Sequence, residues 1–121
     1  GIETIHILGA TGGRADHTIG NTSLLMEYTR MFDLKNITIE MVSDDGTIFP
    51  INDTIEFECG PGRSISIFTP DNSLRIRSEG LMYPTDDVVF DNWWKATLNK
   101  TVQDNVRLEL SHRSIALIML D

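Results

Sequence analysis

The sequence predicts a mainly β protein, in which an antiparallel β-sandwich or barrel-like domain follows one strand and one helix of the α/β type. Three observations predict this fold class: an apolar run ends in a glycine-rich loop, a stretch with helical apolar spacing comes next, and short alternating segments fill the remainder. With 121 residues, the chain is long enough for one domain with a real core and too short for two ordinary ones. We therefore expect one domain, or one domain with a small additional unit.

The first predicted strand is the apolar run from Thr4 to Leu8, and the glycines of GATGG close it. Such continuous runs suit parallel sheets. From His17 to Met31 apolar residues recur at helical spacing, and Asp16 precedes them at the N-cap position. Strand, glycine loop and helix form half of a βαβ unit. Two interpretations stay open: partner strands belong upstream of residue 1, or the first strand joins the β-domain as an edge.

The region after Phe32 changes to short segments in which apolar and polar residues alternate, as in the strands of an antiparallel domain. Turn signals rich in Gly, Pro, Asp and Asn separate the segments at the spacing typical of sandwiches and barrels. The predicted strands are Ile37 to Val42, Thr47 to Ile51, Thr54 to Cys59, Ser64 to Phe68, Leu74 to Arg77, Val88 to Phe90, Arg107 to Leu110 and Ile115 to Leu120.

Composition argues against polyanionic partners. The formal charge of -8 would repel nucleic-acid backbones and anionic lipids over most of the surface. No apolar run approaches the ~20 residues of a membrane-spanning helix, so we expect neither nucleic acid nor a membrane as partner. Cys59 is the single cysteine, which excludes an intrachain disulfide and suits a buried side chain in a reducing cytosol.

The GATGGRADH loop is the most informative segment for chemistry. Gly12 and Gly13 at a strand-to-helix turn let a ligand approach the backbone and suit a phosphate site, although no common nucleotide fingerprint fits the spacing. Arg14 offers a planar donor fork for phosphate oxygens, with a surface ion pair to Asp16 as the alternative. Asp16 at a positive helix end suggests a cationic or hydrogen-bond-donating ligand, unless it is only an N-cap.

Two polar residues follow on one face of the predicted helix. His17 could bind a ligand or shuttle a proton near neutral pH, and a hydrogen-bonded structural histidine is the alternative. Asn21, one turn further on, could complete a polar patch with His17 or be solvated. Neither His6 nor His112 stands at metal-ligand spacing from another ligand type, so the sequence predicts no zinc site.

The distinctive residues of the β-rich part are Tyr83, Trp93 and Trp94. Flat rings stack on heteroaromatic ligands at modest entropic cost, whereas core packing is the alternative for at least one tryptophan. Asn99 offers paired donor and acceptor atoms to a ring edge, with turn formation as its alternative. The sequence leaves open whether Trp93 or Trp94 faces a ligand.

Taken together, GGRADHTIGN with its apolar helix, the Gly80-Leu81-Met82-Tyr83 segment and Asn99 resemble the thiamin pyrophosphokinase family over the whole chain. GGRADH is the strongest piece, similar to the family's Gly-Gly-Arg-x-Asp-His stretch. The other two pieces support it by order and spacing. The resemblance implies that residues 1–32 are the last strand and helix of an α/β domain, and that residues 33–121 form a thiamin-binding β-sandwich domain.

The resemblance also implies an activity. The family consists of cytoplasmic homodimers that transfer a diphosphate group from ATP, with magnesium, to the hydroxyethyl oxygen of thiamin. Each active site lies between subunits, where the α/β domain of one faces the β-domain of the other. The family's aspartate cluster for magnesium and ATP lies upstream of the GGRxDH stretch, so we expect no metal ligands in these 121 residues. Phosphoryl transfer depends on metal neutralisation of charge, so we expect this chain alone to be inactive.

The resemblance assigns site residues to three groups. The phosphate group is Gly12, Gly13 and Arg14, the thiamin group is Asp16, His17, Asn21, Tyr83, Thr97 and Asn99, and the catalytic pair is Asp16 and Arg14. A cationic thiazolium is a favourable neighbour for the carboxylate of Asp16. The family's Ser/Thr-rich stretch ending in Asn reads Lys95-Ala96-Thr97-Leu98-Asn99 here, so only Thr97 and Asn99 are carried over.

A non-catalytic module is the alternative to an enzyme domain. In that interpretation the β-sandwich binds a protein or a small ligand, and the GGRADH loop is only a well-capped helix start. Only the hypothesis of an enzyme domain predicts that a longer protein forms thiamin diphosphate in an ATP-dependent reaction.

Overall fold

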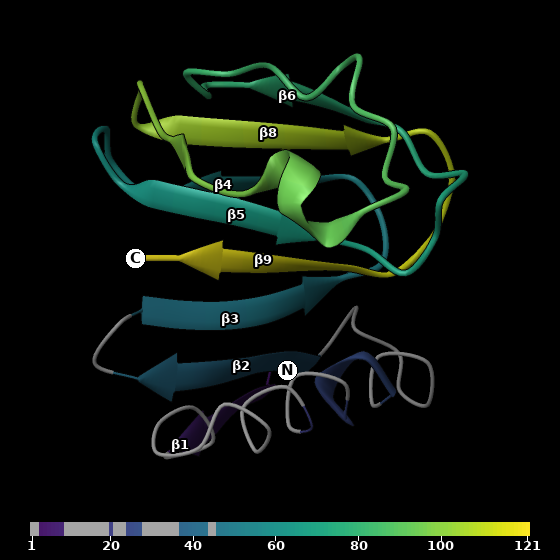
Figure 1. Cartoon of the computed structure of the whole chain (residues 1–121). Coiled ribbons are helices and arrows are strands. Elements are labelled where there is room, and N and C mark those ends of the chain that lie inside the picture. Colours follow the sequence, from purple (N-terminus) through teal and green to yellow (C-terminus); the bar gives the residue numbers. More distant parts are fainter. Residues whose placement is uncertain (1–2, 9–19, 21–23, 28–36, 44–45) are drawn as a thin grey trace.

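The computed structural model describes residues 3–8, 20, 24–27, 37–43 and 46–121, and their strands form two sheets (Figure 1). The larger sheet has the order β1-β2-β3-β9-β5-β7, and the smaller has the order β4-β8-β6. The elements are β1 (Glu3–Leu8), β2 (Ile37–Ser43), β3 (Gly46–Ile51), β4 (Ile55–Glu58), β5 (Ser64–Phe68), β6 (Ile76–Glu79), the short 3-10 helix η1 (Trp93–Ala96), β7 (Asn99–Lys100), β8 (Asn105–Leu110) and β9 (Ala116–Leu120).

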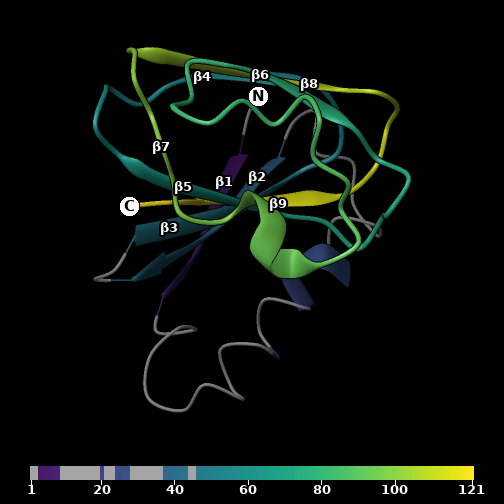
Figure 2. The same cartoon turned by 45° about the horizontal axis from the view of Figure 1, so that its top comes forward.

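The two sheets form a sandwich, as the sequence predicts. Figure 2 shows the smaller sheet as a separate layer above the larger one. Ile67 and Ile118 of the larger sheet and Val106 and Leu108 of the smaller one belong to one buried cluster. The alternation of apolar and polar residues that predicted these strands therefore directs one face of each sheet into a shared core.

The central strand β9 is apolar on both faces. Ala116 and Ile118 face the core between the sheets, whereas Leu117 belongs to a second buried cluster. That cluster also contains Leu25 and Met26 from the helical residues 24–27. A continuous apolar run of this kind is expected where a strand is covered on both sides.

The first strand lies at the outer end of the larger sheet. β1 runs parallel to β2, from the pair Glu3–Ile37 to the pair Leu8–Val42, and the other described strand pairs are antiparallel. Among the described residues this strand joins the β-domain through its pairing with β2, and whether further strands belong beside its other edge stays open. The proposed boundary after residue 32 stays a prediction. Of the predicted helix from His17 to Met31, only Gly20 and residues 24–27 are described, and all of these are helical.

Four sequence predictions need correction. The predicted strand Arg107 to Leu110 begins two residues earlier, at Asn105. The predicted strand Leu74 to Arg77 begins two residues later, because the backbone N–H of Leu74 donates to Asp71 in a turn and the ladder starts at Ile76. The predicted strand Val88 to Phe90 is not a strand, although Phe90 is buried. Cys59 is half-buried at the border of the core rather than fully buried.

Two elements were not predicted from the sequence, namely η1 and β7. Both are short, and β7 consists of the polar residues Asn99 and Lys100, which carry no apolar alternation. None of the helices in the described part of the chain is long and apolar enough to cross a membrane.

Candidate functional site

A cavity of about 210 Å³ lies where the segment after Gly80 meets η1 and β7. Its lining includes Tyr83, Thr85, Lys95, Thr97, Leu98 and Asn99. We call this hollow the Tyr83 cavity. Tyr83, Thr97 and Asn99 are the three site residues that the sequence assigned to the β-rich part, and the structure brings all three together.

Asn99 connects β7 to the segment that carries Tyr83. Its side chain is only 7% exposed, and its Oδ1 accepts hydrogen bonds from the backbone N–H of Tyr83 (3.0 Å) and of Lys100 (2.9 Å). Its Nδ2 donates to the carbonyl of Tyr83 at 2.7 Å. The amide thus pairs with Tyr83 as a neighbouring strand would. Because an amide nitrogen carries two hydrogens, one N–H of Asn99 is left without a partner among the described residues.

The ring of Tyr83 is 62% exposed, so its position depends on the backbone rather than on packing. Gly80 precedes it with φ +92°, and a Cβ at Gly80 would lie 2.6 Å from the carbonyl oxygen of Asn105. Two further backbone bonds extend the pairing: Met82 donates to Lys100 at 2.8 Å, and Val102 donates to Gly80 at 2.9 Å. The glycine of the Gly-Leu-Met-Tyr segment therefore permits the close backbone approach that fixes Tyr83.

Thr97 and Leu98 form the turn between η1 and β7. The hydroxyl and the backbone N–H of Thr97 both donate to the carbonyl of Trp94, at 2.7 and 3.3 Å. Leu98 has φ +58°, a left-handed value that is unusual for a residue with a side chain, and its N–H donates to Ser66 Oγ of β5 at 3.2 Å.

The two tryptophans lie beside the cavity. The ring of Trp93 packs on Phe68, with centroids 5.9 Å apart, and Trp94 is 70% exposed. Neither tryptophan is among the described residues that line the cavity. Lys95 does line it, and its Nζ lies 2.5 Å from Asp91 Oδ1 and 5.8 Å from the centroid of the Trp94 ring. The hydrogen bond from Lys95 lowers the pKa of Asp91.

The remaining site residues of the sequence analysis lie outside the described part of the chain. They are Gly12, Gly13, Arg14, Asp16, His17 and Asn21. Their assignments to phosphate, thiamin and catalysis stay predictions.

The described residues do not fit a magnesium site. They contain no group of three or more His, Cys, Asp or Glu side chains that could hold a metal ion. His6 contacts Glu40 at 3.0 Å and His112 contacts Asp71 at 2.9 Å, and each is a single pair. Magnesium needs several oxygen ligands in octahedral geometry.

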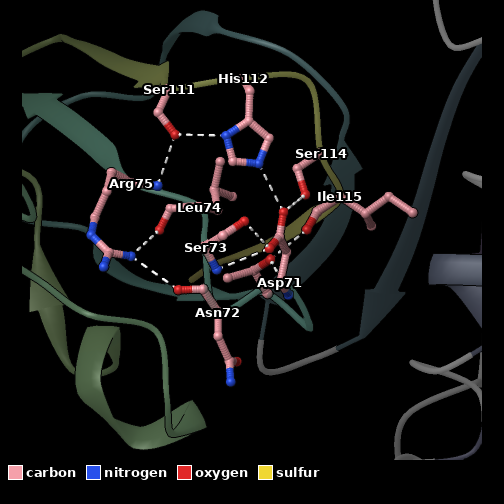
Figure 3. Close-up of polar contacts among 10 residues, drawn as sticks. Asp71, Asn72, Ser73, Leu74, Arg75, Ser111, His112, Ser114 and Ile115 are labelled. Atoms are coloured by element: carbon pink, nitrogen blue, oxygen red, sulfur yellow. Dashed lines mark hydrogen bonds and ion pairs between the residues drawn. The ribbon is translucent and has the colours of Figure 1, made fainter.

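A second polar group joins the loop before β6 to the loop before β9 (Figure 3). The Asp71 cluster consists of Asp71, Ser73, Ser111, His112 and Ser114. Asp71 Oδ1 accepts bonds from the hydroxyl (2.6 Å) and the N–H (2.9 Å) of Ser73. Asp71 Oδ2 accepts from Ser114 Oγ at 2.7 Å and lies 2.9 Å from His112 Nε2. These bonds hold the pKa of Asp71 far below its usual value. The bond from Ser73 lowers the pKa most, followed by those from Ser114 and His112.

The contacts from Ser111 to His112 and from His112 to Asp71 resemble those of a catalytic triad. The remaining hydrogen bonds, however, indicate a structural role. Ser111 Oγ lies 3.0 Å from His112 Nδ1 and accepts the backbone N–H of Arg75 at 3.0 Å. Each carboxylate oxygen of Asp71 already has two hydrogen-bond partners. The cluster is therefore a cross-link between two loops. No sequence pattern predicted this cluster, because 41 residues separate Asp71 from His112.

These observations define the described part of the chain as a β-sandwich with a small cavity lined by polar and aromatic side chains. Residues 46–116, more than half of the chain, match the model of the thiamin pyrophosphokinase substrate-binding domain, and the chain belongs to this family. The match contains the whole of the Tyr83 cavity.

Known thiamin pyrophosphokinases are similar to this chain over part of their length. Thiamine pyrophosphokinase 1 of Oryza sativa subsp. japonica is 41% identical over 61 residues, which are 50% of this chain and 21% of the rice protein. The crystal structure of thiamine pyrophosphokinase from Bacillus subtilis is similar with a TM-score of 0.78 at 22% identity, covering 98% of this chain and 55% of that one. Thiamin pyrophosphokinase from Candida albicans is similar with a TM-score of 0.75 at 18% identity, covering 98% of this chain and 44% of that one. The chain thus spans about half the length, or less, of these relatives.

Proposed function

We propose that this chain is the thiamin-binding part of a thiamin pyrophosphokinase that makes thiamin diphosphate from thiamin and ATP. In the balanced reaction, the hydroxyethyl oxygen of thiamin bonds to the β-phosphorus of ATP, the bond from that phosphorus to the α,β-bridging oxygen breaks, and AMP leaves while the hydroxyl loses its proton. The observation that carries the proposal is that Tyr83, Thr97 and Asn99 line one cavity although 16 residues separate the first from the last.

The chemistry of the Tyr83 cavity suits a flat polar ring. The exposed face of Tyr83 is available for stacking, and the second N–H of Asn99 can donate to a ring nitrogen. The net charge of -8 favours a cationic ligand such as thiamin over the chain as a whole.

The size of the cavity suits one ring rather than the whole ligand, since cavities for complete small molecules are usually about 300 Å³ or larger. We propose that the GGRADH loop of a partner subunit covers the remainder in a cytoplasmic homodimer. In this arrangement Asp16, His17 and Asn21 contact thiamin, while Gly12, Gly13 and Arg14 contact the phosphates. Asp16 and Arg14 are the proposed catalytic pair.

The nucleotide side of the reaction is proposed to depend on residues beyond this chain. Because the described residues do not fit magnesium, we propose that the carboxylates for magnesium and ATP belong to another part of a longer protein. The 121-residue chain alone should then make no thiamin diphosphate, since the transfer needs the metal to neutralise developing charge.

The experiment measures thiamin diphosphate formation from ATP and thiamin by the full-length protein, alongside the 121-residue chain. We expect turnover only with the former. Tyr83→Ala in the full-length protein should weaken thiamin binding about 10-fold, because stacking on an aromatic side chain typically contributes ~1 to 3 kcal/mol. Val102→Ala, which trims another exposed apolar residue, is the matched control and should leave binding unchanged. Turnover with a different acceptor and none with thiamin contradicts the proposal, and thiamin binding without turnover favours the non-catalytic module.

A further inference from the structure

Leu98 combines two unfavourable features in one residue. It is the one non-glycine residue of the described part with positive φ, and its side chain is 87% exposed although it is apolar. Left-handed positions normally hold Gly, Asn or Asp, because a Cβ crowds the following carbonyl there. Strain that persists at a residue near a cavity is a reason to look for a function.

The strained conformation is imposed from both sides. Thr97 is tied to the carbonyl of Trp94 by two hydrogen bonds, and Asn99 is tied to Tyr83 by two. The N–H of Leu98 itself donates to Ser66 Oγ. The chain therefore has to reverse between two fixed residues, and the Leu98 side chain becomes part of the cavity lining.

We propose that Leu98 is a substrate-contacting residue of the Tyr83 cavity, whose isobutyl group packs against the ring of the ligand as an apolar wall. This inference rests on the proposed function. The Leu98 side chain offers the cavity four carbons and no hydrogen-bonding group. The contact favours an alkyl-substituted heteroaromatic ring, which loses exposed apolar surface together with Leu98 on binding.

Leu98→Gly separates this role from a structural one. Glycine adopts positive φ without strain, so the variant should unfold at a higher temperature than the parent. The same variant removes the wall, so its Kd for thiamin should rise at least 5-fold, within the range that removal of a small apolar contact produces. If Leu98 merely shaped the turn, stability would change and thiamin affinity would not.

Two further variants decide whether the wall must be apolar. Leu98→Asn tolerates the left-handed backbone and has a similar size but is polar, so it should bind thiamin as weakly as Leu98→Gly. Leu98→Met keeps an apolar side chain and should bind within 2-fold of the parent. Val102→Ala is the control for loss of exposed apolar surface elsewhere and should also stay within 2-fold.

The measurements are isothermal titration calorimetry with thiamin and steady-state kinetics, both on the full-length protein, together with thermal unfolding. We expect KM for thiamin to follow Kd, with kcat within 2-fold for all variants. The inference is overturned if Leu98→Gly and Leu98→Asn both bind within 2-fold of the parent, or if Leu98→Met binds as weakly as they do. A parent protein that does not bind thiamin contradicts the proposed function instead, so the two failures are distinguishable.

Discussion

The Tyr83 cavity and the Asp71 cluster are both polar regions that join segments far apart in the chain, and they differ in how their polar groups are used. In the Asp71 cluster, each carboxylate oxygen accepts two hydrogen bonds. At the Tyr83 cavity, one N–H of Asn99 is left over, the ring of Tyr83 is exposed, and Leu98 is held in a strained backbone conformation. The unused donor and the imposed strain agree with the proposed ligand site at the Tyr83 cavity, whereas complete pairing makes the Asp71 cluster a structural cross-link.

Among substitutions in these two regions, Asn99→Ala should be the most damaging. The variant removes three bonds to backbone groups and leaves the N–H groups of Tyr83 and Lys100 without their acceptor. We expect a loss of about 2 kcal/mol in the free energy of unfolding, measured by urea denaturation, because three part-buried hydrogen bonds to backbone groups are lost and each contributes ~0.5 to 1.5 kcal/mol. Thiamin binding should be lost as well. Asn105→Ala, at an exposed strand position, is the control, and an equal loss there would show that Asn99 has no special role.

Asp71→Asn should produce a smaller effect of a different kind. An amide cannot accept all four bonds, so we expect about 1 to 3 kcal/mol of destabilisation in urea unfolding. Because the cluster is a cross-link between loops, the Kd for thiamin should stay within 2-fold of the parent. Asp87→Asn, at an exposed carboxylate outside the cluster, is the control. A loss of thiamin affinity without a loss of stability would erase the distinction between the two regions.

The pH dependence of stability tests the same carboxylate. The pKa of Asp71 is lower in the folded protein than its ordinary value of 3.8, so its stabilisation is fully present above about pH 5 and is lost as the pH falls through and below 4. The difference in unfolding free energy between parent and Asp71→Asn should therefore be constant just above pH 5 and shrink toward pH 2. A difference that does not change below pH 4 would mean that the charge of Asp71 is not what the cluster stabilises.

The smallest expected effect concerns Asp91, which lies outside the cavity and pairs with Lys95 on its wall. Asp91→Asn leaves the Lys95 ammonium unneutralised beside the proposed site of a cationic ligand. We expect thiamin affinity to fall about 2-fold at low salt and to recover at high salt, because exposed charges are screened. Asp87→Asn again serves as control. Equal affinities at all salt concentrations would show that Lys95 does not influence the cavity electrostatically.

The sequence predicted most of the sandwich because its strands alternate in hydrophobicity. Ser64 to Phe68 was predicted with the observed bounds, and β9 was predicted to within one residue. The failures share a cause, since Leu74 and Phe90 are buried from turns and irregular segments rather than from ladders. The pattern of apolar residues indicates which side chains are buried, but a buried side chain need not belong to a paired strand.

The candidate site was only partly predictable. Tyr83 and Asn99 were candidates by residue type and Thr97 was added through the resemblance, whereas no residue type predicted that Leu98 would have positive φ. That conformation depends on bonds to Ser66 and Tyr83, which lie 32 and 16 residues away from the residues they fix. The Asp71 cluster likewise depends on long-range contacts, and sequence periodicity carries no information about those.

The central position of β9 also has a consequence for how the protein is made. In the larger sheet, β9 lies between β3 and β5, which have no direct pairing with each other. A ribosome synthesises β3 and β5 more than 45 residues before it reaches Leu120, so both strands must wait with open edges until β9 emerges. Open apolar edges invite pairing between chains. Nascent chains of this protein should therefore depend on chaperones until β9 is free, and slower synthesis of Ala116–Leu120 should lower the yield of folded protein.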